Sequence, residues 1–261
     1  MDISLSGKRA LICGSTQGIG LAIAKELATL GAHCVLVARN EESLHAALSS
    51  LDNTKGQKHH FLVADFSNPE DLQMVIEAYV KHSPVQVLVN NTGGPKPGPI
   101  IEEPEEKFVE AFRMHLVCNQ ILAKAVLPGM RDAGYGRIIN VISTSVRIPI
   151  SNLGVSNTIR AAVASWAKTW ANEVGVYNIT VNSILPGYTE TQRLESLIET
   201  NAAKRGIPAA ELADQMRASI PMKRFGKAGE IAAVAAFLAS PAASFVNGVS
   251  IPVDGGSTGT I

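Results

Sequence analysis

The chain has little of several residue types, and each shortage excludes a class of protein. Aromatic residues make up 5% of the sequence, and cysteine occurs only at Cys13, Cys34 and Cys118. An odd number of widely spaced cysteines does not build a disulfide framework, so we expect reduced, buried thiols. The sequence shows no metal-ligand spacing of His, Cys and carboxylates, and no apolar run long enough to span a membrane.

Neither sign of charge is in excess. Lys plus Arg and Asp plus Glu each number 23, so the formal net charge is +0 and no net field favours nucleic acid or an anionic membrane. The polar start of the chain lacks the pattern of a signal peptide, which predicts a cytoplasmic location. Hydrophobic residues make up 46%, which suits a single globular domain over residues 1–261.

Short apolar runs alternate with segments of helical periodicity, which predicts a parallel sheet covered by helices on both faces. We expect strands at 9–13, 33–37, 60–64, 86–90, 137–142, 179–184 and 249–253. We expect helices at 18–30, 41–51, 69–82, 105–130, 156–175 and 228–239. Residues 188–222 are long, polar and helix-prone, and they follow the sixth strand. Ligands bind beyond the carboxyl ends of such strands, so we expect a substrate-covering helical insertion there.

A glycine-rich turn follows the first predicted strand. Gly14, Gly18 and Gly20 have a Gly-x-x-x-Gly-x-Gly spacing just before a helix. Small residues let the backbone turn tightly and approach a pyrophosphate at the helix N-terminus. The alternative is a tight strand-to-helix turn without a ligand. We predict a dinucleotide site that includes Gly14, Ser15, Thr16, Gln17, Gly18, Ile19 and Gly20.

The end of the second predicted strand indicates which dinucleotide would bind. An NAD site usually has an acidic residue about 20 residues after the glycines, bonding the ribose 2′-hydroxyl. Here Ala38 stands at that position and Arg39 follows. An arginine attracts a 2′-phosphate, so we predict NADP (NADPH) rather than NAD. The alternative is that Arg39 points to solvent and either cofactor binds.

With these residues in place, the chain resembles the short-chain dehydrogenase/reductase family over essentially its whole length. Cys13 replaces the Thr of the family's first glycine motif. The matching segments are Cys13–Gly20, Asp65 in "VADFS", Asn90–Gly93 in "NNTG", Pro186 with Gly187, Thr189 and Thr191, and Val253–Gly256. The stretches "NNTGGPKPGP" and "STSVRIPI…SNTIR" look like bacterial members labelled 3-oxoacyl-carrier-protein reductase.

The resemblance implies an α/β, single-domain Rossmann fold, a seven-stranded parallel sheet with helices on both faces. It implies a homo-oligomer, a tetramer or dimer, and a small-molecule or acyl-type substrate. It also implies cofactor contacts at Asp65, Phe66, Asn91, Gly93, Arg160, Pro186, Gly187, Thr189 and Thr191.

The same resemblance identifies the catalytic positions. The family uses a Ser, a Tyr thirteen residues later, a Lys four beyond it, and an Asn from an earlier helix. These positions hold Ser143, Ser156, Arg160 and His115, so one of four matches.

The substituted residues still permit chemistry. A serine hydroxyl is a far weaker acid than a phenol, but Ser143 and Ser156 could donate hydrogen bonds to a developing alkoxide. Arg160 could stabilise that charge and hold the ribose hydroxyls. His115 is the nearby group expected to titrate near neutral pH, and it could relay a proton through water. The alternatives are that Ser143 caps a strand end, Ser156 caps its helix, Arg160 faces solvent and His115 is packed in the helix.

Two function classes follow. The first is an NADP-dependent oxidoreductase acting on a carbonyl or hydroxyl group, possibly of a 3-oxoacyl-type substrate. The second is a catalytically silent dinucleotide-binding sensor or partner subunit, which the missing Tyr motivates. A third, weaker option is epimerisation or dehydration on the same fold.

Overall fold

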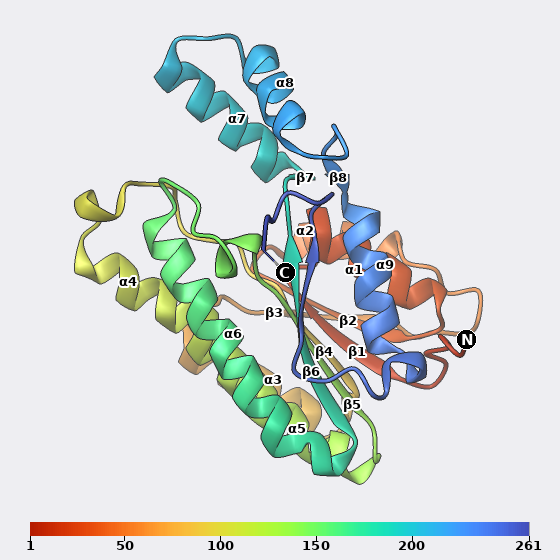
Figure 1. Ribbon diagram of the computed structural model, residues 1–261. Helices are drawn as coiled ribbons and strands as arrows, with labels where there is room; N and C mark the ends of the chain where they lie inside the picture. Colours follow the sequence, from red (N-terminus) through yellow and green to blue (C-terminus); the bar gives the residue numbers. More distant parts are fainter. Residues whose placement is uncertain (261) are drawn as a thin grey trace.

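The structure is a computed structural model that describes residues 1–260. In this range, seven parallel strands form one sheet in the order β3-β2-β1-β4-β5-β6-β9 (Figure 1). The strands are β1 (Arg9–Cys13), β2 (His33–Ala38), β3 (His60–Val63), β4 (Val87–Asn90), β5 (Gly136–Val141), β6 (Ile179–Pro186) and β9 (Ser250–Val253). The predicted seven-stranded parallel sheet is therefore confirmed. The strand order reverses between β1 and β4, where an open α/β sheet has its ligand crevice.

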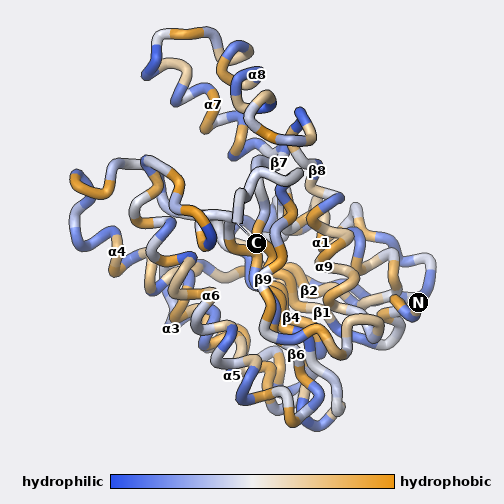
Figure 2. The backbone as a smooth tube through the Cα atoms, in the orientation of Figure 1, coloured by the Kyte–Doolittle hydropathy of each residue, from blue (hydrophilic) through white to orange (hydrophobic). Residues whose placement is uncertain are grey.

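Helices cover both faces of the sheet, as predicted (Figure 1). The first face carries α1 (Gly18–Thr29), α2 (Glu41–Ser49) and α9 (Ala228–Ala239). The second face carries α3 (Pro69–Val80), α5 (Cys118–Asp132) and α6 (Gly154–Val174), and α4 (Glu105–Phe112) packs against α6. Strands covered on both faces must be apolar along their whole length, and Figure 2 shows hydrophobic colouring on the central strands.

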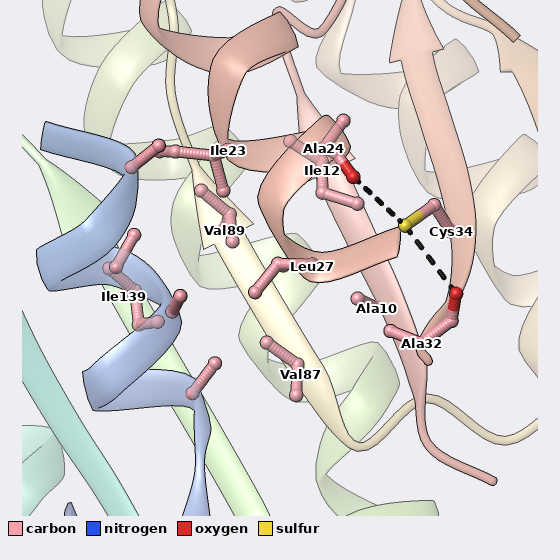
Figure 3. Close-up of a cluster of buried hydrophobic side chains, with 14 of the residues drawn as sticks. Ala10, Ile12, Ile23, Ala24, Leu27, Ala32, Cys34, Val87, Val89 and Ile139 are labelled. Atoms are coloured by element: carbon pink, nitrogen blue, oxygen red, sulfur yellow. Dashed lines mark hydrogen bonds between the residues drawn. The ribbon is translucent and has the colours of Figure 1, made fainter. Parts of the chain in front are cut away.

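The hydrophobic cluster on the first face explains why the strands are apolar. Ile12 of β1 and Val89 of β4 are fully buried, and Leu27 of α1 packs into the same cluster (Figure 3). The thiol of Cys34 donates to the carbonyl oxygen of Ala24 at 3.4 Å. Burial raises the pKa of this thiol to about 12, which leaves it protonated at neutral pH.

The other two cysteines are also free and buried. Burial raises the pKa of Cys118 to about 12, and it raises the pKa of Cys13 further. The prediction that Cys13 and Cys34 are buried is confirmed.

Two predicted helices differ from the observed ones near the catalytic positions. The helix expected at 105–130 is interrupted by a π-helical turn, Arg113–Val117. Such turns are uncommon and are found frequently at functional sites. The helix expected at 156–175 begins two residues earlier, at Gly154. Ser156 therefore lies inside the first turn, and its predicted role as the helix cap is wrong.

The segment after β6 forms a separate layer. It contains β7 (Thr189–Glu190), α7 (Gln192–Arg205) and α8 (Ala209–Ser219), and β7 pairs in parallel with β8 (Gly226–Lys227). Figure 1 shows α7 and α8 projecting beyond the carboxyl ends of the strands. They have a hydrophobic cluster of their own: Leu194, Ile198, Ala202, Leu212, Ala213, Ile220 and Phe225. In the part of the chain that the structure describes, no helix combines the length and hydrophobicity needed to cross a bilayer.

Candidate active site

A cleft of about 760 Å³ lies along the carboxyl ends of the strands. Fifteen of the predicted cofactor residues line it: Gly14, Thr16, Gln17, Gly18, Ile19, Arg39, Asp65, Phe66, Asn91, Gly93, Arg160, Pro186, Gly187, Thr189 and Thr191. We call the part around the glycine turn and Arg39 the nucleotide end. The part around Arg160 and the loop after β4 is the catalytic end.

The glycine turn is held by backbone geometry. Gly14 and Gly18 have φ of +57° and +54°, in the left-handed region that favours glycine. A Cβ at Gly14 would lie 2.5 Å from the carbonyl oxygen of Asn91. The Asn91 side-chain amide donates to the carbonyl oxygens of Cys13 and Gly14, each at 3.2 Å. These contacts lock β1, the turn and the end of β4 together.

The first turn of α1 can receive an anion. Among residues 1–260, Gln17 and its neighbours provide no side-chain cap to this helix end, and its first turn contains no acidic residue. The free N–H groups and the helix dipole therefore suit a pyrophosphate. The residues at the nucleotide end fit a dinucleotide.

Two predicted cofactor residues, Ser15 and Gly20, do not line the cleft but contact the backbone around the glycine turn. Ser15 is fully buried, and its hydroxyl accepts a hydrogen bond from the Val37 N–H at 3.1 Å. A Cβ at Gly20 would lie 2.1 Å from the carbonyl oxygen of Gly14. Both residues therefore shape the turn, and their contact with the cofactor stays a prediction.

The end of β2 places a cation in the cleft wall. Arg39 is exposed and lines the cleft next to Ala38, and no ion pair involving it is present within residues 1–260. The next residue, Asn40, is occupied as the N-cap of α2, where it accepts from the Ser43 N–H at 2.7 Å. The Arg39 guanidinium is available for a phosphate at this edge.

Arg160 is a buried part of the cleft wall rather than a solvent-facing charge. The residue is 9% exposed. Its guanidinium donates to the carbonyl oxygens of Val141 at 2.9 Å and Thr92 at 3.4 Å. Burial and the nearby charge of Arg193 lower its pKa to about 10, so it stays charged at neutral pH. The alternative of a solvated arginine is excluded.

The two serines keep their hydroxyl hydrogens free to donate. Ser143 accepts a hydrogen bond from the Ser145 N–H at 3.1 Å and caps the short 3₁₀ turn Thr144–Val146. Ser156 lies in the first turn of α6. Both are half-buried, and neither belongs to the residues that line the cleft. Ser143 therefore caps a 3₁₀ turn rather than the strand end that the alternative named.

His115 lies on the π-helical turn and is 2% exposed. Its Nδ1 is 2.5 Å from the hydroxyl oxygen of Thr92, whereas its Nε2 has no hydrogen-bond partner among residues 1–260. Burial, with the charges of Arg160 and Arg193, lowers its pKa to about 3. The expectation that His115 titrates near neutral pH is wrong, because burial, together with the two neighbouring guanidiniums, disfavours the charged imidazolium.

Arg193 is a cleft residue that the sequence analysis missed. It lies in the first turn of α7, and its guanidinium donates to the carbonyl oxygens of Gly94 at 3.0 Å and Pro95 at 3.4 Å. Arg193 is exposed overall, but the partial burial of its guanidinium against this loop lowers its pKa. Its position two residues after Thr191, within a motif already assigned to the cofactor, was the available signal. Among residues 1–260, no group of His, Cys, Asp and Glu could hold a metal ion.

Comparisons with known proteins identify the family of the chain. Residues 14–258 match a family model described as enoyl-(acyl carrier protein) reductase. The chain is 34% identical to 3-oxoacyl-[acyl-carrier-protein] reductase FabG of Vibrio cholerae, over 97% of this chain and 98% of that protein. It is 32% identical to dehydrogenase/reductase SDR family member 4 of Bos taurus, over 97% of this chain and 88% of that protein.

A solved structure is similar over the whole chain. L-sorbose reductase from Gluconobacter frateurii, complexed with NADPH and L-sorbose, has a TM-score of 0.93 and 34% identity. The alignment covers 100% of both chains.

Proposed function

Because the chain belongs to the short-chain dehydrogenase/reductase family, we propose that it is an NADP-dependent oxidoreductase that interconverts a carbonyl and a hydroxyl group. Its substrate is a small or acyl-type molecule, with 3-oxoacyl groups among the candidates. The observation that carries the proposal is Arg160, a buried cation anchored on two backbone carbonyls in the wall of the cleft.

The cofactor is NADP, held mainly by backbone groups at the nucleotide end. The N-terminus of α1 receives the pyrophosphate, and Arg39 receives the 2′-phosphate. Bound NADPH supplies the hydride. Asp65 and Phe66 line the cleft beyond β3, where an adenine would lie.

At the catalytic end, the protein stabilises negative charge on the carbonyl oxygen. Arg160 holds the ribose hydroxyls and contributes a positive field to the site. Ser143 donates its hydroxyl hydrogen, because its oxygen already accepts from the Ser145 N–H. Ser156 occupies the family's Tyr position and adds a second hydroxyl from α6.

The proton comes from water rather than from a side chain. Ser156 is a weak acid, Arg160 keeps its proton at neutral pH, and His115 is neutral with a pKa of about 3. Loss of a well-placed general acid costs about 10²–10⁴ in rate. The protein is therefore a slow reductase, or one whose substrate brings its own proton relay.

Residues 188–222 cover the substrate in this proposal. Thr191 at the start of α7 lies over the glycine turn, with its Cγ2 3.3 Å from the position of a Cβ at Gly18. Tyr188, Gln192 and Leu197 line the cleft from the same segment.

The proposal includes a homo-oligomer, a dimer or tetramer, in the cytoplasm. Val109 and Phe112 of α4 and Phe245 near the C-terminus are large apolar side chains left exposed in the single chain. A second copy would cover such residues. Light scattering of the purified protein measures the assembly directly.

The test is consumption of NADPH by the purified protein with a panel of ketones, aldehydes and 3-oxoacyl thioesters. We expect slow turnover of at least one compound, and a further loss in Ser143→Ala. Background rates across the panel, with no change in Ser143→Ala, would reject an oxidoreductase.

A catalytically silent dinucleotide-binding protein is the second candidate. The observation that favours it is that His115 is neutral and that Ser156 stands where the family has a Tyr. No side chain at the catalytic positions therefore exchanges a proton near neutral pH. It predicts NADPH binding without turnover. Efficient steady-state turnover by the pure protein would eliminate it.

A further inference from the structure

We propose that the substrate carries a carboxylate, and that Arg193 together with Arg160 binds it at the catalytic end of the cleft. This inference rests on the proposed oxidoreductase function and adds a substrate class, oxo acids and the corresponding hydroxy acids.

The two guanidiniums converge on one point of the loop after β4. A Cβ at Gly94 would lie 2.9 Å from Nη2 of Arg193 and 3.2 Å from Nη2 of Arg160. The two side chains come from different elements, α7 and α6, and both line the cleft. A side chain at Gly94 would therefore press on the ends of both arginines.

Nothing in the described chain neutralises this pair. Within residues 1–260, each ion pair lies elsewhere, and all four hydrogen bonds donated by the two guanidiniums end on backbone carbonyls. Glu195 is the acidic residue in the first turn of α7, and it forms no ion pair with either arginine. The positive end of the α7 dipole and the exposed Lys96 add to the same field.

The pKa shifts of Arg160 and His115 are consistent with an anion site at this point. Burial and the charge of Arg193 lower the pKa of Arg160, and both arginines help to lower the pKa of His115. Burial is the main cause of both shifts, and the charges of the neighbouring arginines act in the same direction. A bound anion would relieve this repulsion, and a carboxylate matches the planar fork of a guanidinium.

The anion we infer belongs to the substrate rather than to the cofactor. The nucleotide end already offers the α1 N-terminus for the pyrophosphate and Arg39 for the 2′-phosphate. Arg193 reaches Gly94 and Pro95 from the substrate-covering segment, and its side chain stays accessible. A carboxylate held there lies at the catalytic end of the cleft, beside Arg160.

The overall reaction balances for an oxo acid. Hydride from NADPH forms a C–H bond at the carbonyl carbon, the C=O π bond breaks, and water supplies the proton to the oxygen. The products are the hydroxy acid and NADP⁺. The carboxylate remains unchanged on the arginines.

The experiment compares oxo acids with their methyl esters, which keep the ketone and remove the charge. We expect the wild type to prefer the acid, and Arg193→Met to lower kcat/KM for the acid about 10- to 100-fold more than for the ester. Arg205→Met, which removes an exposed arginine from the last turn of the same helix, is the matched control and should leave both values unchanged.

Three outcomes decide the question. Equal turnover of acid and ester by the wild type overturns the carboxylate inference and leaves the oxidoreductase standing. A large loss of NADPH affinity in Arg193→Met, with the acid preference intact, assigns Arg193 to the cofactor pyrophosphate and also overturns it. If no compound is reduced, the proposed function fails, and calorimetric titration of oxo acids into the protein–NADP⁺ mixture then decides: binding that Arg193→Met abolishes supports the inference, and no binding overturns it.

Discussion

The nucleotide end of the cleft is built by the backbone, whereas the catalytic end is built by side chains. Gly14 and Gly18 shape the turn through their positive φ angles, and the Asn91 amide donates hydrogen bonds to two backbone carbonyl oxygens. At the other end, Arg160 is a buried positive charge and His115 is a buried neutral imidazole. The resemblance in sequence predicts that the first set keeps the family pattern and that three of the four positions assigned to catalysis depart from it.

The difference has a physical reason. A tight turn that admits a phosphate has few solutions, since a Cβ at Gly14 or Gly20 would collide with backbone atoms. A developing negative charge can instead be stabilised by several donors and cations. The two ends should therefore respond differently to substitution.

The largest effect is expected at the catalytic end, in Arg160→Ala. This change removes a buried cation and leaves the carbonyls of Val141 and Thr92 without their donor. We expect turnover to fall about 10²–10³-fold, with weaker cofactor binding. Arg160→Lys keeps the charge and should recover part of the loss. Equal activity of wild type and Arg160→Ala would show that this end is not the reacting centre.

Gly20→Ala is the matching test of the nucleotide end. The new Cβ would meet the Gly14 carbonyl oxygen at 2.1 Å, so the backbone of the turn must shift. We expect NADPH affinity to fall more than tenfold and the free energy of unfolding to fall by about 1–3 kcal/mol. Fluorescence titration and urea denaturation measure the two quantities.

Gly229→Ala is the control for this prediction. A Cβ at Gly229 would have nothing within 4 Å, so the change should not weaken NADPH binding. If Gly20→Ala behaves like Gly229→Ala, the turn is not built as described.

A smaller and more selective effect is expected from Arg39→Ala. Loss of the guanidinium should weaken NADPH binding about 10- to 100-fold. Binding of NADH, which lacks the 2′-phosphate, should change little, so NADH serves as the internal control. Parallel losses for both cofactors would instead give Arg39 a general structural role.

The smallest effect at neutral pH is a pH dependence of stability that belongs to His115, and it grows only as the pH falls below 6.5. Its pKa is about 3 in the folded protein, against 6.5 for an ordinary histidine. Between these pH values the unfolded chain binds a proton that the folded protein does not. The contribution of His115 to the free energy of unfolding is therefore complete above pH 6.5 and is lost as the pH falls toward 3. The contribution is at most about 1.4 kcal/mol per pH unit.

Comparison of wild type with His115→Asn isolates this contribution from the carboxylates. Urea denaturation at several pH values should show a shallower decline for His115→Asn below pH 6.5. Identical slopes for the two proteins would mean that His115 is protonated in the folded state.

The sequence predicted the parts of the molecule that depend on local pattern. The strands and most helices followed from apolar periodicity, and the glycine turn followed from spacing. Ser156 was misplaced because the helix begins at Gly154, where no strong capping residue marks its start. The neutral state of His115 and the approach of Arg193 to Gly94 depend on contacts between distant segments. Periodicity carries no information about such contacts.

A crystal structure of the protein with NADP⁺ tests most directly whether one dinucleotide spans both ends of the cleft. The account predicts the 2′-phosphate beside Arg39, the pyrophosphate at the start of α1, and the nicotinamide ribose within hydrogen-bond distance of Arg160. A dinucleotide whose ribose lies out of reach of Arg160, or crystals that bind none at saturating concentration, would contradict it.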